Sequence, residues 1–380
     1  MRIVVAPDSF KECLTAREVA DAMAAGARRA MPDASIDLIP MADGGEGTVD
    51  ALVAAAGGEK VCVTVTGPCG EPVDAAYGVI DGGRTAVIEM AAASGLALVP
   101  PDRRDPRLTT TYGTGELIAD ALGAGIRRII VGLGGSATND GGAGMAQALG
   151  FRLLDAQGDD LDPGGAALMR LATIDPSGRL GGLDESEILV ACDVDNPLCG
   201  PRGASRTYGP QKGAHEFAVQ ELDAALHHFG KCIEKQLGKP VLHAPGAGAA
   251  GGLGAGLIAF CGATLRPGVD LVADACNLRG RIHGADLVIT GEGRIDGQSA
   301  HGKTPVGVAR IAKEAGVPVL ALAGALGEDA SVVYNCGIDA VFAIGDRPMN
   351  LEEALVRARP LIAATTEAGV RLWAAARSTG

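Results

Sequence analysis

The sequence is poor in aromatic residues and has no excess of positive charge. Only 3% of its 380 residues are Phe, Trp or Tyr, so an apolar core must be built mainly from Ala, Val, Leu and Ile. The formal net charge is -13, whereas proteins that bind nucleic acids usually carry a basic patch or domain. No apolar run reaches the roughly 18 residues of a membrane-spanning helix. We therefore expect neither a nucleic-acid partner nor a membrane association.

Paired cysteines are also missing, and we expect no signal peptide. The nine cysteines occur singly, and an odd number without a Cys-x-x-Cys pair fits reduced thiols better than a disulfide framework. The six histidines are dispersed without metal-ligand spacing, so we expect no structural zinc. The first apolar run is interrupted by Pro7 and Asp8, too soon for a signal peptide. These features predict a cytoplasmic protein.

Both ends of the chain show the alternation of strands and helices that a parallel sheet requires. Near the start, apolar strands at 2–6 and 35–39 flank an amphipathic helix at 15–31. Near the end, three apolar strands are separated by helical segments; these strands are 286–290, 317–322 and 340–344. Between the two ends, closely spaced strands with Gly-Pro and Asp-Gly-Gly turns predict antiparallel hairpins.

The length and this pattern predict an α/β protein of two domains, at about 100–200 residues per domain. We expect residues 1–60 and 270–380 to form one discontinuous, doubly wound domain with a parallel sheet. Residues 61–269 would form an inserted domain of mixed α/β structure.

A glycine-rich segment at 132–144 follows an apolar strand and precedes a helical stretch. Glycines let backbone N–H groups converge on an anion, and the following helix adds a positive dipole end, so such a loop can bind phosphate. A tight packing turn is the alternative. The residues that we expect to hold nucleotide phosphates are Gly134, Gly135, Ser136, Thr138, Asn139 and Gly141.

The glycine-rich segment does not match the named phosphate motifs. It lacks the Gly-Lys-Ser/Thr ending of a P-loop and gives no good dinucleotide fingerprint with an acidic residue about twenty positions later. It looks superficially like the loop of the kinases that phosphorylate homoserine, mevalonate and galactose, but nothing else in the chain supports that family.

Further loops combine acids, cations and glycines where predicted strands end, which is where open α/β sheets bind ligands. Taken singly, each could be a capped turn. Together they supply carboxylates suited to Mg²⁺ and cations suited to a carboxylate or a phosphate. Phosphoryl transfer needs this inventory. The loops are 8–11, 42–48, 193–197, 208–214 and 290–304.

These motifs occur in the order seen in bacterial glycerate kinases that make 2-phosphoglycerate, and the chain resembles that family from Met1 to about Ala375. Departures are mild, with Cys13 where glycine is common and Tyr208 in place of phenylalanine. The resemblance implies ATP-dependent phosphorylation of D-glycerate with Mg²⁺. It also implies a flavodoxin-like domain split by an inserted one.

The chemistry of the side chains suggests a role for each candidate residue. We expect catalysis from Asp193, Asp296, Lys11 and Lys303, substrate binding from Asp8, Ser9, Arg294, Glu292 and Lys212, and magnesium at Asp43, Glu46 and Asp193. One of the two lysines would neutralise the transferred group, and Arg294 would bind the substrate carboxylate. Either Asp193 or Asp296 would take the hydroxyl proton.

Alternatives remain at this stage. The substrate could be a related small hydroxy acid, and the product could be 3-phosphoglycerate. A non-catalytic nucleotide or metabolite sensor is a third possibility, which the many acids beside cations argue against. The expected partners are D-glycerate and ATP, and a homo-oligomer is left open.

Overall fold

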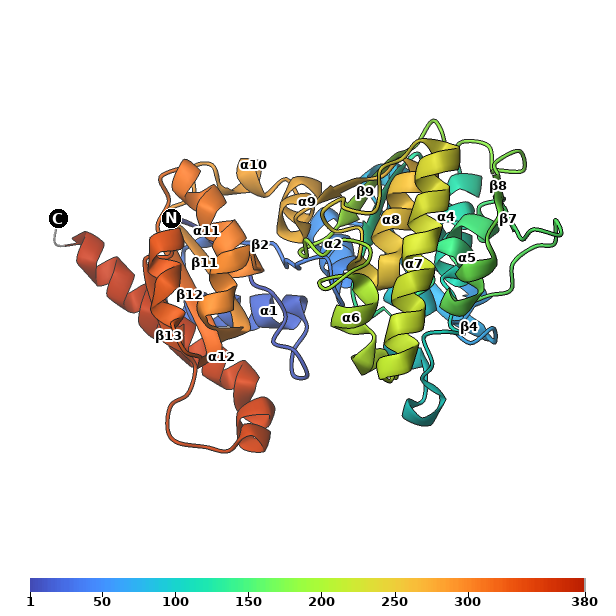
Figure 1. Ribbon diagram of the computed structural model, residues 1–380. Helices are drawn as coiled ribbons and strands as arrows, with labels where there is room; N and C mark the ends of the chain where they lie inside the picture. Colours follow the sequence, from blue (N-terminus) through green and yellow to red (C-terminus); the bar gives the residue numbers. More distant parts are fainter. Residues whose placement is uncertain (379–380) are drawn as a thin grey trace. The chain divides into compact units, whose positions relative to one another are not determined.

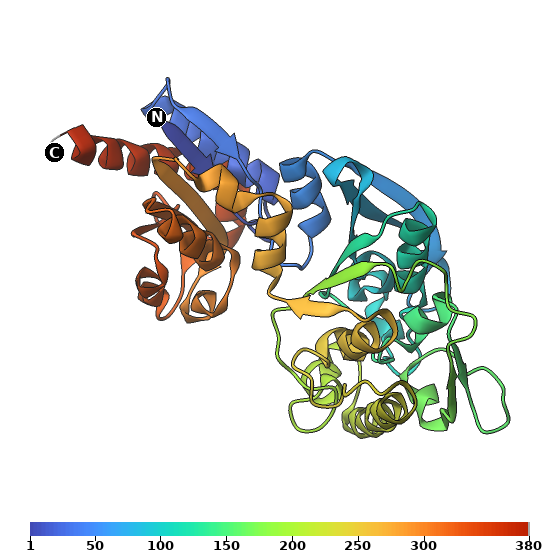
Figure 2. The ribbon, with the colours of Figure 1, turned by 90° about the horizontal axis from the view of Figure 1, so that it is seen from above.

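The computed structural model describes residues 1–378, which form two compact units (Figure 1). The first unit joins Met1–Asp43 and Asp50–Gly57 to the chain from Val269 onward, so the N-terminal segment and the C-terminal segment fold together (Figure 2). The second unit contains Gly44–Val49 and Gly58–Gly268. The predicted α/β class is confirmed, whereas the domain limits drawn from the sequence stay a prediction.

The first unit is built on a five-stranded parallel sheet with the order β13-β12-β11-β1-β2. Counted along this unit the order is 2-1-3-4-5, that of flavodoxin-like sheets, and the order reverses between β1 and β11. The strands are β1 (Arg2–Val5), β2 (Ser35–Leu38), β11 (Leu287–Ile295), β12 (Val319–Leu326) and β13 (Ala340–Ala343).

Helices cover both faces of this sheet. Right-handed crossovers that run in opposite directions from the switch point place α1 and α11 on opposite faces. Helix α1 begins at a capping box formed by Thr15 and Glu18, and it packs against α12 (Figure 1). The helices are α1 (Ala16–Ala30), α2 (Thr48–Ala56), α9 (Gly268–Ala275), α10 (Leu278–Ile282), α11 (Thr304–Glu314) and α12 (Leu351–Ser378).

The second unit contains a six-stranded mixed sheet with the order β10-β9-β6-β5-β4-β3. Strands β3, β4 and β5 pair antiparallel, as their turns predicted, and β5, β6, β9 and β10 pair parallel. The strands are β3 (Glu59–Thr66), β4 (Pro72–Ile80), β5 (Thr85–Glu89), β6 (Arg128–Gly132), β9 (Glu187–Ala191) and β10 (Thr264–Arg266), with a separate hairpin of β7 (Arg152–Leu154) and β8 (Thr173–Asp175).

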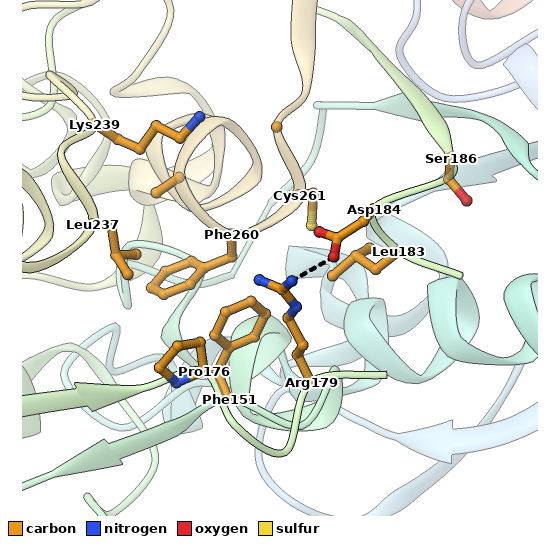
Figure 3. Close-up of a pocket in the computed structure, with 12 residues that line it drawn as sticks. Phe151, Pro176, Arg179, Leu183, Asp184, Ser186, Leu237, Lys239, Phe260 and Cys261 are labelled. Carbon is orange, nitrogen blue, oxygen red and sulfur yellow. Dashed lines mark hydrogen bonds and ion pairs between the residues drawn. The ribbon is translucent and has the colours of Figure 1, made fainter. Parts of the chain in front are cut away.

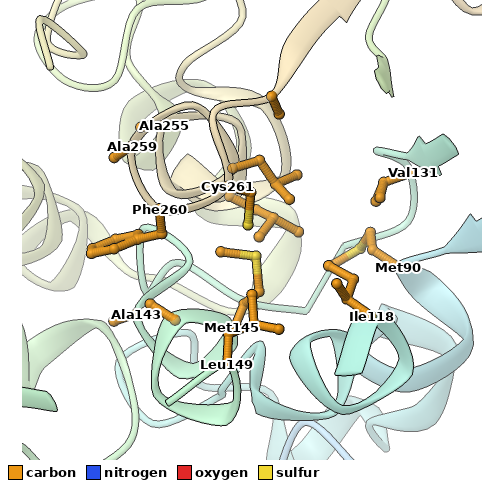
Figure 4. Packing of buried hydrophobic residues seen from close by; sticks show 14 of the residues in the cluster. Met90, Ile118, Val131, Ala143, Met145, Leu149, Ala255, Ala259, Phe260 and Cys261 are labelled. Atoms are coloured by element: carbon orange, nitrogen blue, oxygen red, sulfur yellow. The ribbon is translucent and has the colours of Figure 1, made fainter. Parts of the chain in front are cut away.

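The core of the second unit is aliphatic and rich in sulfur. Figure 4 shows Met90, Met145 and Cys261 among small and branched side chains, with Phe260 at the edge of the group. Phe260 packs edge to face on Phe151, with ring centroids 5.0 Å apart. The α-helices of this unit are α3 (Ala91–Ser94), α4 (Tyr112–Gly123), α5 (Ala143–Ala148), α6 (Ala204–Tyr208), α7 (Glu216–Leu237) and α8 (Ala249–Cys261).

Short 3₁₀ helices complete both units. They are η1 (Asp81–Gly83), η2 (Leu96–Leu98), η3 (Pro101–Arg103), η4 (Gly165–Arg170), η5 (Pro210–Lys212), η6 (Gly297–His301) and η7 (Ala330–Cys336). Among residues 1–378, no helix has the length and apolar character needed to cross a membrane.

The sequence interpretation was wrong about residues 291–295. They were expected to form a loop after a strand ending at residue 290, but β11 continues to Ile295 and pairs with β12. Gly291 serves close packing in the sheet, because a Cβ there would lie 2.3 Å from the Leu322 oxygen. Glycine therefore marks a close approach between strands here and not a turn.

The interface between α1 and α12 depends on a glycine. A Cβ on Gly26 would lie 2.1 Å from the backbone oxygen of Ala363. We predict that Gly26→Ala lowers the free energy of unfolding by about 1–3 kcal/mol, as overpacking typically does. Urea unfolding measures this loss. The matched control is Gly123→Ala in α4, where a Cβ meets open space; an equal loss in both variants would contradict the prediction.

Candidate active site

In the first unit, acidic side chains gather at the switch point of the sheet. Asp8 follows β1, and its backbone N–H donates to the Gly291 oxygen in β11 at 2.9 Å. Glu292 is the next residue of β11, so the chain beyond β1 and the middle of β11 bring two carboxylates side by side. Open α/β sheets bind ligands at this position.

Asp8 is held by hydrogen bonds to both of its carboxylate oxygens. It accepts one from the Ser9 N–H at 2.6 Å and one from the Thr304 hydroxyl, at the start of α11, at 2.5 Å. Burial and, to a smaller extent, the nearby charge of Asp43 raise the pKa of Asp8 to about 6. The two hydrogen bonds and the charge of Lys11 oppose this rise.

Glu292 is only 9% exposed, which is unusual for an acid in a strand. Its Oε1 accepts a hydrogen bond from the Ser299 hydroxyl at 2.6 Å, and its Oε2 lies 3.7 Å from Lys303 Nζ. The pKa of Glu292 is raised to about 7, mainly by burial and also by the charges of Asp8 and Asp296, whereas Ser299 and Lys303 oppose the rise.

Asp296 has a different environment although it lies only four residues further on. It is the N-cap of η6, accepting hydrogen bonds from the Gln298 N–H and from Arg294 Nε, both at 3.0 Å. Partial burial raises the pKa of Asp296, but the Gln298 bond and the charges of Lys303 and Arg294 outweigh it, so the pKa is lowered. Arg294 itself is well exposed.

In the second unit, the glycine-rich segment joins β6 to α5, as predicted. Gly135 has a φ of +66° in the left-handed region. Within the described chain, the backbone N–H groups of Gly134, Gly135 and Ser136 donate to no protein acceptor. Consecutive free N–H groups around a left-handed residue form the concave arrangement that binds anions.

Asp140 organises the rest of this segment. Its buried carboxylate accepts four hydrogen bonds, from the Thr111 N–H and hydroxyl and from the N–H groups of Gly142 and Gly144. Burial raises its pKa despite these donors. The N–H groups at the start of α5 are thus already used, so the anion-binding part of the segment is its first half.

Lys212 is the most unusual group of the second unit. It is 2% exposed and donates to the Ser136 hydroxyl at 2.6 Å and to the Thr138 oxygen at 2.8 Å. Burial lowers the pKa of Lys212 to about 7, although the charge of Asp140 acts in the opposite direction. The lysine therefore braces the glycine-rich segment from η5.

Two buried oxygens beside Lys212 remain without a partner. Among the described residues, Thr138 Oγ1 and Asn139 Oδ1 accept no hydrogen bond, while Asn139 Nδ2 donates to the Ser205 hydroxyl at 3.0 Å. Unsatisfied buried polar atoms are rare in proteins. Each therefore lacks the hydrogen-bond partner that a bound water or a small polar group would supply.

The predicted metal ligands are distributed over both units. Asp43 belongs to the first unit, and Glu46 and Asp193 belong to the second. Asp193 follows β9 and accepts a hydrogen bond from the Gly268 N–H at 2.8 Å. Among the side chains that the structure describes, no three from His, Cys, Asp or Glu could hold one metal ion together. Magnesium usually takes only one or two carboxylates together with phosphate oxygens, so Asp43, Glu46 or Asp193 fits its chemistry.

Sequence reasoning missed the hydroxyl partners of these charged groups. Ser299 and Thr304 hold the two acids of the first unit, and Ser205 and Thr111 hold the glycine-rich segment. Ser299 could have been found, because it lies three residues after Asp296 in a capping-box arrangement. The partners of Ser205 and Thr111 depend on tertiary packing and leave no local signal.

A cavity of about 390 Å³ lies elsewhere in the second unit (Figure 3). Phe151, Phe260 and the ion-paired Arg179 and Asp184 line it. Its wall includes Ser186, which directly precedes β9, so it lies beside the amino end of that strand. The polar clusters follow the carboxyl ends, and none of the predicted site residues lines this cavity.

Known proteins similar to this chain agree with one another. Over residues 3–374 the sequence matches the glycerate kinase family. A glycerate kinase from Halalkalibacterium halodurans is 54% identical over 98% of each chain, and a glycerate 2-kinase from Escherichia coli is 53% identical over 98% of this chain and 99% of its own. A solved structure from Salmonella typhimurium LT2, provisionally assigned as glycerate kinase 2, superposes with a TM-score of 0.92 at 52% identity, covering 100% and 99% of the two chains.

The lowered pKa of Lys212 predicts a pH dependence of stability. Because an unfolded lysine has a pKa of about 10.4, the unfolded chain binds more protons than the folded one above about pH 7. The stability of the wild type should therefore rise with pH relative to Lys212→Met, by at most about 1.4 kcal/mol per pH unit. Urea unfolding between about pH 7 and 8.5 measures this slope.

The exposed Lys239 of the same unit provides the control for this experiment. The Lys239→Met variant should track the wild type across the same pH range. A constant difference between the wild type and Lys212→Met would show that Lys212 keeps its proton throughout, contrary to the prediction.

Proposed function

The chain belongs to the glycerate kinase family, and we propose that it transfers the γ-phosphoryl group of ATP to D-glycerate to give 2-phosphoglycerate. The family match over residues 3–374 carries this proposal. The name of the Escherichia coli relative, glycerate 2-kinase, supports the position of transfer. A related hydroxy acid as substrate, or 3-phosphoglycerate as product, is the alternative. We also propose a cytoplasmic location.

The first half of the glycine-rich segment would hold the nucleotide phosphates. The free N–H groups of Gly134, Gly135 and Ser136 support this role, because they can donate to phosphate oxygens without losing a protein partner. Thr138, Asn139 and Gly141 would complete the binding site, braced by Lys212. Donors that are already fixed in place stabilise developing negative charge without reorganisation.

The first unit would bind the acceptor. Arg294 is exposed and carries the planar guanidinium that suits a carboxylate. Lys303 or Lys11 would neutralise the transferred phosphoryl group, and Ser9 and Asp8 would contact the substrate hydroxyls. Asp193 and Asp296 remain proposed members of the catalytic set. A magnesium ion held by Asp43, Glu46 or Asp193 would neutralise charge on the phosphate oxygens.

Glycerate-dependent turnover is the direct test. We predict that the purified protein with ATP and Mg²⁺ releases ADP rapidly only when D-glycerate is added, which a coupled assay for ADP measures. An assay specific for 2-phosphoglycerate then identifies the product. Release of ADP at the same rate with and without glycerate, or no release at all, would contradict the proposal.

The nucleotide role of the glycine-rich segment can be tested separately. Gly135→Ala forces a side chain into the left-handed region and distorts the free N–H groups, so the KM for ATP should rise about tenfold or more, the equivalent of about 1.4 kcal/mol. The matched control is Gly158→Ala, which has a φ of +87° and open space around a Cβ. Equal KM values in the two variants would argue that the segment is a packing turn.

A further inference from the structure

The acids of the first unit differ in how fully their oxygens are occupied. Asp8 and Asp296 each accept hydrogen bonds on both carboxylate oxygens. Glu292 accepts one on Oε1 only, and within the described residues no donor bonds to its Oε2. Lys303 Nζ lies 3.7 Å from Oε2, too far for a good hydrogen bond but near enough to attract the charge.

The orientation of Glu292 is fixed by a chain of donors. The Asp296 N–H donates to the Ser299 oxygen at 3.2 Å, which leaves the Ser299 hydroxyl proton directed to Glu292 Oε1 at 2.6 Å. The carboxylate is therefore held in one position with its second oxygen open. A general base must lie within hydrogen-bond reach of the proton that it takes, and the second oxygen of Glu292 is available for such a contact.

We propose that Glu292 is the general base that takes the hydroxyl proton of the acceptor, with Ser299 as its positioning residue. This inference rests on the proposed kinase function. In the step, the glycerate hydroxyl oxygen forms a bond to the γ-phosphorus while the bond from that phosphorus to the β,γ-bridging oxygen breaks. ADP leaves with the electron pair of the broken bond, the hydroxyl proton passes to Glu292 Oε2, and the acid later releases it to water.

The electrostatic surroundings suit this role. Burial raises the pKa of Glu292 to about 7, close to a cellular pH, where a base is both ionised and strong enough to accept a proton. The charged groups that act on it come from three neighbouring elements: Asp8 beyond β1, Asp296 at the start of η6 and Lys303 at the start of α11. Activity should therefore fall as the pH drops through about 7.

The experiment compares Glu292→Gln with the wild type in the glycerate-dependent assay. Glutamine keeps the size of the side chain and an oxygen for Ser299, so the fold should be retained, which a thermal unfolding scan checks. We expect kcat to fall about 10²–10⁴-fold with little change in the KM for ATP. The exposed Glu352→Gln in α12 is the matched control and should keep the wild-type kcat.

Ser299→Ala gives an independent readout. Because the Ser299 hydrogen bond lowers the pKa of Glu292, its loss should move the acidic limb of the kcat profile to higher pH. A limb that stays in place, or a Glu292→Gln variant with kcat within tenfold of wild type, would overturn the assignment while leaving the kinase function intact. A wild type without glycerate-dependent turnover would instead overturn the proposed function, and the base with it.

Discussion

The parallel pairing of β1 with β11 is the constraint on which the first unit depends. It sets Ile3 opposite Leu287 and so joins the start of the chain to its last third. The strand order reverses at this pair, so the connections diverge and leave the ends of both strands uncovered by a crossover. Asp8 and Glu292 occupy that position, and the hydrogen bond between the Asp8 N–H and the Gly291 oxygen ties the backbone of Asp8 to the residue before Glu292. The acids of the site are thus positioned by backbone pairing.

The second unit positions its charges by burial. Burying a lysine away from water costs free energy unless its N–H donors find acceptors. Lys212 directs two of its three N–H donors to the glycine-rich segment. The Asp140 carboxylate accepts hydrogen bonds from the backbone N–H groups of Thr111, Gly142 and Gly144 and so holds the segment in place. A segment rich in glycine would otherwise lose much entropy on ordering. These charged groups therefore give rigidity to a backbone that has little side-chain packing of its own.

Several parts of this arrangement were readable in the sequence because their signals are local. The strand, glycine-rich segment and helix at 132–144 and the parallel sheet of the first unit follow from apolar periodicity and from the loops between. The flavodoxin-like strand order was expected only from the family resemblance. The continuation of β11 through Gly291–Ile295 could not be predicted, because the need for glycine there comes from the close approach of a neighbouring strand. The same holds for the partners of Lys212, which follow from packing between segments distant in sequence.

Glu292 and Asp296 illustrate how environment divides chemical roles between similar residues. Both acids come from one short stretch of chain, yet burial raises the pKa of Glu292, whereas hydrogen-bond donors and cations lower that of Asp296. A carboxylate with a low pKa and both oxygens occupied is a stable cap but a weak base. Its neighbour, with a pKa near 7 and one open oxygen, can exchange a proton. The cap supports the base directly, since the Asp296 N–H orients the Ser299 hydroxyl that holds Glu292.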